Sequence, residues 1–118
     1  MKKYLPLLLV VMLAFAGCQR EPATYEMTDN PRDVTAHAEK FVNRVCKLSK
    51  HYTTEDWNAA IEQFVTMSKN YFENSRFMTE EERMQFDQTR MNFMNAVETN
   101  GNEDLVAQVK EAYAHVIE

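Results

Sequence analysis

The sequence predicts an all-α protein, a small antiparallel three- to four-helix bundle. The chain has 118 residues with only 2 glycines and 3 prolines, which leaves little material for β-turns. Four segments each begin with residues that cap helices, and apolar residues recur in each of them at three- and four-residue steps. Short connections join these segments, and short connections favour antiparallel packing of successive helices.

The chain begins with the features of an export signal. Two lysines precede an apolar run from Leu5 to Ala16, which leads into Gly17 and Cys18. A positive start, a short apolar core and small residues at the cleavage point are typical of a secretory signal peptide. The run is shorter than the roughly 20 residues that a membrane-spanning helix needs. Because Cys18 directly follows Ala-Gly, the segment resembles a bacterial lipoprotein signal, with Phe15 where leucine is usual.

This resemblance implies that residues 1–17 are a cleaved lipoprotein signal peptide and that Cys18 becomes a lipidated amino terminus. Such a protein is anchored to the membrane by its lipid and does not span it. Residues 18–30 contain Pro22 and no sustained apolar period, which predicts a flexible tether. Residues 31–118 are predicted to form the helical bundle. An ordinary cleaved signal with a coincidental cysteine is the alternative.

The first helix is predicted from Pro31 to His51, with Asn30 as its N-cap and proline at its first position. Cys46 lies at the flank of its apolar face and is predicted to be a small core or border residue. Once Cys18 carries lipid, Cys46 has no partner for an intramolecular disulfide. The apolar face consists of Val34, Ala38, Phe41, Val45, Leu48 and Tyr52.

The second helix is predicted to begin after Thr53 or Thr54 and to end near Asn74. Glu55 and Asp56 occupy its first turn, where the helix dipole favours negative charge. Its apolar face consists of Trp57, Ala60, Ile61, Phe64, Ser68, Tyr71 and Phe72. The single tryptophan stands in the first turn and is predicted to close one end of the core.

Two further helices complete the predicted bundle. The sequence from Thr79 to Glu82 matches a capping box, and the helix that follows is predicted to run to about Thr99. Asn100 and Gly101 predict a left-handed stop. The fourth helix is predicted to begin at Asn102–Asp104, and its apolar face consists of Leu105, Val109, Ala112 and Val116.

The third helix carries two apolar stripes rather than one. The first stripe consists of Phe86, Phe93 and Val97, and the second consists of Met84, Met91 and Met94. In one interpretation, each stripe packs on a different neighbouring helix. In the other, the methionine stripe stays partly open as an adaptable surface for a protein partner, because methionine side chains reshape readily.

A second resemblance rests on Tyr52–Trp57, on Phe64 and Tyr71, and on Thr79–Glu82. Together with the signal, this pattern resembles small helical lipoproteins of Bacteroidota that have no known function. The match extends over helices between residues 41 and 97. It implies a cell-envelope lipoprotein and supplies no catalytic residue. Inner-membrane lipoproteins of other bacteria have aspartate directly after the lipidated cysteine, whereas this chain has Gln19. The absence of this aspartate favours the outer membrane.

Composition and residue spacing argue against several classes of function. The net charge is −5, and it becomes −7 without the two signal lysines. This balance argues against binding nucleic acid, or an anionic membrane face, through a basic patch. His37, His51 and His115 stand apart in the sequence, so no metal site and no cofactor are predicted. No serine or cysteine has a nearby base in a pattern that would make it a nucleophile.

These observations predict a non-enzymatic lipoprotein of the cell envelope that binds a protein partner or has a structural role. The alternative is a periplasmic small-ligand binding module that carries a lipid or another apolar ligand between its helices. An enzyme would require residues that converge only in the folded chain, such as Tyr71, His115 and a carboxylate.

Overall fold

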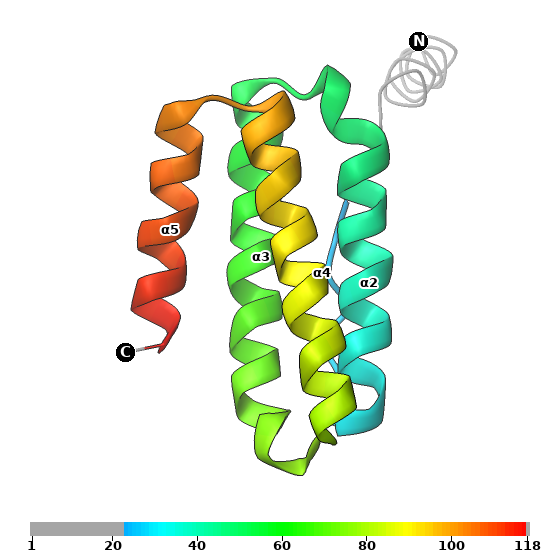
Figure 1. Ribbon diagram of the computed structural model, residues 1–118. Helices are drawn as coiled ribbons and strands as arrows, with labels where there is room; N and C mark the ends of the chain where they lie inside the picture. Colours follow the sequence, from blue (N-terminus) through cyan, green and yellow to red (C-terminus); the bar gives the residue numbers. More distant parts are fainter. Residues whose placement is uncertain (1–22, 118) are drawn as a thin grey trace, which may run out of the picture.

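The computed structural model describes residues 23–117, which form an antiparallel bundle preceded by an extended segment (Figure 1). The described helices are α2 (Pro31–Leu48), α3 (Thr54–Asn74), α4 (Glu80–Asn100) and α5 (Glu103–Ile117). Two short 3-10 turns, η1 (Ser49–His51) and η2 (Ser75–Phe77), connect α2 to α3 and α3 to α4. The predicted all-α bundle is confirmed, with four described helices as its members. The predicted signal peptide and the predicted lipidation site, Cys18, lie outside the described residues.

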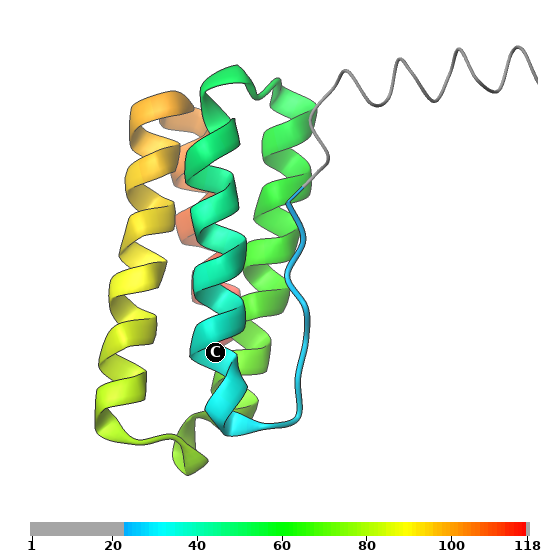
Figure 2. The same ribbon diagram turned by 90° about the vertical axis from the view of Figure 1, so that its right-hand side faces the viewer.

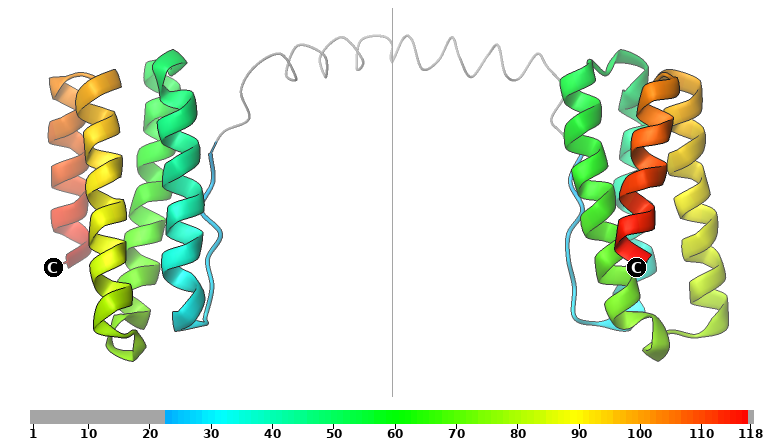
Figure 3. Two further views of the ribbon diagram at one scale, coloured as in Figure 1. Left: turned by 45° about the vertical axis from the view of Figure 1, so that its right-hand side comes forward. Right: turned by 90° about the vertical axis from the view of Figure 1, so that its left-hand side faces the viewer.

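The four helices surround one core. α2 packs on α3 and α4, and α5 packs on the same two helices from the opposite side. Figure 2 shows α2 in front of α3 and α4, and the right-hand view of Figure 3 shows α5 in front of them from the other side. Leu105 and Val109 of α5 are buried in the core. The fourth helix therefore completes the bundle.

Local capping explains where the helices begin. Thr53, rather than Thr54, caps α3, and both Thr53 and Thr79 form reciprocal capping boxes with the residue three positions later. The side chain of Asn30 accepts a hydrogen bond from the amide of Arg32 at 3.0 Å. The side chain of Asn102 accepts from the amide of Leu105 at 2.9 Å. Each bond satisfies a backbone donor that the first helical turn leaves without a partner.

An aromatic cluster fills the centre of the bundle. Phe93 of α4 is fully buried and stacks on Phe64 of α3, with ring centroids 4.4 Å apart. Its ring also meets Phe41 of α2 at 6.0 Å and Trp57 at 6.4 Å. Trp57 is 2% exposed and contacts the ring of Tyr52 at 5.0 Å, so it closes one end of the core as predicted.

The predicted left-handed stop at Gly101 is wrong. Gly101 has φ −101°, outside the left-handed region, and its amide donates to the carbonyl of Val97 at 2.8 Å. A side chain at this position would place Cβ 2.7 Å from that carbonyl oxygen and 3.2 Å from a methyl group of Leu105. Glycine is therefore favoured by the close approach of the Val97 carbonyl in the last turn of α4, with Leu105 of α5 a lesser contact, and not by a positive φ.

The prediction of a flexible tether over residues 18–30 is wrong for residues 23–30, which we call the N-terminal strap. Ala23 and Tyr25 are only 3% and 6% exposed and belong to the hydrophobic core. The strap lies along the bundle beside α2 and α3 (Figure 2). The amide of Tyr25 donates to Oε1 of Gln63 at 2.8 Å, and the ring of Tyr25 packs edge-on against Phe41.

Asn70 of α3 holds the strap through its side-chain amide. Its Oδ1 accepts from the hydroxyl of Tyr25 at 2.6 Å and from the amide of Thr28 at 3.1 Å. Its Nδ2 donates to the carbonyl of Thr28 at 2.9 Å. Burial raises the pKa of Tyr25 to about 12, so the phenol stays protonated and remains a donor at neutral pH.

Candidate functional site

The methionine stripe of α4 is divided by the fold. Met84 is 65% exposed and Met91 is 51% exposed, and we call this pair the methionine surface. Met94 is half-buried and packs against the core. The interpretation in which the whole stripe packs on a neighbouring helix is therefore wrong for Met84 and Met91. The other interpretation, an open partner surface made of all three methionines, is wrong for Met94.

The geometry of α4 explains this division. The core side of the helix presents Phe86 and Phe93, which are both fully buried. On one flank, the guanidinium of Arg90 lies 4.9 Å from the ring centroid of Tyr113 on α5. On the other flank, the carbonyl of Asn92 lies 3.9 Å from the sulfur of Cys46 on α2. Met84 and Met91 are seven residues apart, so they share the remaining outward face two turns from each other.

A shallow depression surrounds Met84. Its volume is about 500 Å³, and it is lined by Glu80, Glu81, Met84, Gln85 and Gln88. The glutamates belong to the first turn of α4, where the helix dipole favours them. The methionine surface thus combines flexible apolar side chains with an acidic border. A partner with apolar side chains and a basic border would complement it.

Exposed apolar surface continues at the turn before α4. Phe77 is 65% exposed, with the guanidinium of Arg76 4.9 Å from its ring centroid, whereas Met78 is buried. Arg83 donates to the carbonyls of Ser75 and Met78 at 3.1 and 2.7 Å, which ties α4 to this turn. The turn is thus fixed next to the methionine surface.

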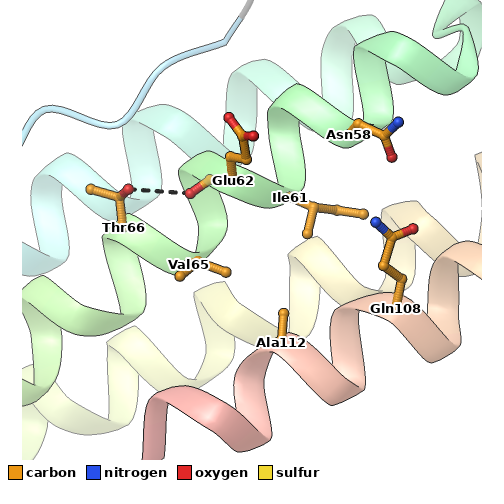
Figure 4. A pocket seen from close by; sticks show the side chains of 7 residues that line it. All are labelled: Asn58, Ile61, Glu62, Val65, Thr66, Gln108 and Ala112. Carbon is orange, nitrogen blue, oxygen red and sulfur yellow. Dashed lines mark hydrogen bonds between the residues drawn. The ribbon is translucent and has the colours of Figure 1, made fainter.

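A second depression lies between α3 and α5 (Figure 4). It is an open groove of about 690 Å³ with Ile61, Val65 and Ala112 on its floor. Its polar lining residues are Asn58, Glu62, Thr66 and Gln108. The hydroxyl of Thr66 donates to the carbonyl of Glu62 at 3.2 Å, so this hydroxyl is already satisfied within α3. The stacked rings of Phe64 and Phe93 lie in the core and do not line this groove.

The three histidines lie on different elements of the bundle. Nδ1 of His37 donates to the carbonyl of Glu26 in the strap at 2.8 Å. His51 lies in η1, and His115 lies near the end of α5. Across the described residues, no group of three or more His, Cys, Asp or Glu side chains is placed to hold a metal ion.

Cys46 is exposed at the edge between α2 and α4, so the prediction of a core residue is wrong and that of a border residue is right. Desolvation at this edge raises the pKa of its thiol. A raised pKa lowers the thiolate fraction and with it the reactivity of the sulfur.

Tyr71, a residue that an enzyme interpretation would use, is held in the core. Its ring stacks on Phe86, with centroids 3.9 Å apart. Burial raises its pKa most, and Asp87 and Tyr113 raise it further, whereas Arg83 and Arg90 lower it. A raised pKa keeps the phenol protonated at neutral pH and makes it a poor general base.

No family model, curated protein or solved structure matches the chain. In residues 23–117, no helix has the length and apolar character needed to cross a membrane.

Proposed function

We propose that this chain is a non-enzymatic lipoprotein of the cell envelope that binds a protein partner through the methionine surface. The observation that carries the proposal is the exposure of Met84 and Met91 on a bundle whose other large apolar side chains are mostly buried. Methionine is frequent on surfaces that bind proteins, because its unbranched side chain adapts to the shape of a partner. The acidic border adds charge selectivity.

The anchor in this proposal is lipid on Cys18, and the membrane is the outer membrane. Its support is the arrangement of two lysines, a short apolar run and small residues directly before Cys18. The resemblance to Bacteroidota lipoproteins points to the same compartment. Two or more acyl chains hold a protein stably on a bilayer, so no spanning helix is required.

Replacing Cys18 with alanine should release the protein from the membrane. The wild-type chain expressed in a bacterial host should partition into the detergent phase of Triton X-114, and its intact mass should show the added acyl groups. The variant should carry no acyl mass and should lose detergent-phase partitioning once its signal is processed. Detergent partitioning that is unchanged in the variant would contradict the lipid anchor. Cys46→Ala is the matched control and should behave like the wild type.

Replacing Met84 and Met91 together with glutamate should abolish partner binding and leave the bundle folded. Both side chains are exposed, and substitutions at exposed positions usually change stability by within about 0.5 kcal/mol. The measurement is photo-crosslinking in the native host, with the crosslinker placed at position 85 in both the wild-type and the doubly substituted background. The wild type should give one defined adduct, and the double variant should give none.

The matched control is Thr99→Glu with Ala107→Glu, which adds the same charge at exposed positions that do not line the depression around Met84. Its adduct is read with the crosslinker at position 85 and should match that of the wild type. Loss of the adduct in this control, or its persistence in the methionine variant, would refute the methionine surface as the contact. Thermal unfolding confirms that both variants fold.

A further inference from the structure

The folded strap fixes which side of the bundle a lipid on Cys18 would bring to the membrane. Ala23 is 3% exposed and packed in the core, so the free chain between Cys18 and the folded body is short. Five Cα–Cα steps separate the two residues, and a fully extended chain of that length reaches at most about 18 Å. A lipidated Cys18 therefore keeps the surface around Ala23 within that distance of the lipid.

The position of Ala23 along the bundle follows from the strap contacts. His37 of α2 bonds to the carbonyl of Glu26, which sets the two segments side by side. Three extended residues cover about 10 Å, which equals the rise of about seven helical residues. Since the strap runs antiparallel to α2, Ala23 lies near the level of Arg44. Figure 2 shows this start of the described chain beside α2 and α3, at the edge of the bundle opposite α4.

The same face of α2 carries a row of basic side chains. Lys40, Arg44 and Lys47 follow one another at four- and three-residue steps, so they share one face, and all three are exposed. His37, which contacts the strap, lies one turn before Lys40 on this face. We call these three basic residues, Lys40, Arg44 and Lys47, the basic ridge.

Charge is distributed unevenly over the bundle. From Pro31 to His51 the chain has five basic and two acidic side chains. Each of α3, α4 and α5 has more acidic than basic side chains. The exposed Glu26 and Asp29 of the strap lie beside this segment and reduce its excess from +3 to +1. The net negative charge of the whole chain, which argued against contact with an anionic membrane face, thus conceals one segment with a net positive charge, next to the start of the strap.

We infer that the basic ridge of α2 rests on the anionic phospholipid headgroups of the membrane that carries the lipid anchor. Basic residues gain attraction from an anionic surface only within about a Debye length, near 10 Å at 0.1 M salt. The link from Cys18 to Ala23, at most about 18 Å long, is short enough to let the ridge come within this range. α4 lies at the edge of the bundle opposite the start of the strap (Figure 2). Because Met84 and Met91 are exposed on α4, this orientation leaves the methionine surface facing away from the bilayer. This inference rests on the lipid anchor proposed above.

The test measures the distance of two helices from the headgroups. The acylated full chain, with Cys46→Ala, is reconstituted in vesicles of phosphatidylethanolamine and phosphatidylglycerol at 3:1 that contain a nitroxide-headgroup lipid. A bimane label is attached at Asn43→Cys on α2 or at Ala107→Cys on α5, both exposed positions. Quenching should be several-fold stronger at position 43. Lys40→Glu with Lys47→Glu should reduce it to the level seen at position 107.

The matched control is Lys69→Glu on α3 with Lys110→Glu on α5. It changes the total charge by the same amount as the ridge variant and should leave the quenching at position 43 unchanged. Intact mass and detergent partitioning are measured first. A chain without acyl groups would overturn both the anchor and the inference built on it. An acylated chain with equal quenching at the two positions, or with quenching at position 43 that persists after charge reversal of the ridge, would overturn the inference alone.

Discussion

Replacing Phe93 with alanine should destabilise the bundle by about 3–5 kcal/mol, the usual cost of removing a buried phenylalanine ring. Phe93 is fully buried and touches the rings of Phe41 of α2 and of Trp57 and Phe64 of α3. The ring thus joins α2, α3 and α4, and its loss leaves a cavity lined by rigid rings that collapse poorly. In a domain of this size the melting temperature should fall by roughly 15–30 °C.

Chemical denaturation of the purified protein measures this loss. Met91→Ala is the matched control, because Met91 lies on the same helix two residues away and is 51% exposed. Its free energy of unfolding should differ from that of the wild type by less than about 0.5 kcal/mol. A Phe93→Ala variant as stable as Met91→Ala would show that the four rings do not form the centre of the core.

Replacing Asn70 with alanine should detach the N-terminal strap and lower the free energy of unfolding by about 2 kcal/mol, the scale of a buried polar network that loses one member. Asn70 is 1% exposed, and its amide accepts from Tyr25 and Thr28 and donates to Thr28. Without it, the Tyr25 hydroxyl and the Thr28 amide lose these bonds, and the Thr28 carbonyl keeps only the 3.5 Å bond from Nδ2 of Asn74. They regain partners most readily in water, so the strap should leave the bundle while the helices persist.

Hydrogen exchange reports this detachment directly. The amides of Tyr25 and Thr28 are bonded to side chains of α3, and their exchange should accelerate strongly in Asn70→Ala while that of the α4 core remains slow. Asn58→Ala is the matched control, since Asn58 is an exposed asparagine of the same helix. Unchanged protection at Thr28 in Asn70→Ala would refute the role of Asn70 in holding the strap.

Strap detachment also bears on the membrane contact. If the strap separates from α2 and α3, the free chain after Cys18 lengthens by several residues, and the bundle surface around Ala23 is no longer held within about 18 Å of the lipid. A strap packed along the bundle is therefore the feature that would convert a lipid anchor into a defined orientation.

The sequence by itself determined the helices and their approximate ends, because these depend on local chemistry. Thr53 and Thr79 bond to amides three residues away, and Asn30 bonds to one two residues away. Such bonds form within one turn, so a short stretch of sequence predicts them. The apolar periods likewise predicted that Phe41, Phe64 and Phe93 face a common core.

The tertiary structure alone decided which apolar residues stay exposed and where the tether ends. Met84, Met91 and Met94 share one stripe in the sequence, yet only Met94 is packed against the core. The exposure of each side chain depends on how the neighbouring helices pack around α4. The strap has no hydrophobic periodicity from which its packing could be predicted. Its Tyr25 bonds to Asn70, which lies 45 residues later in the chain. Contacts between distant residues arise only once the helices are assembled, and no local pattern encodes them.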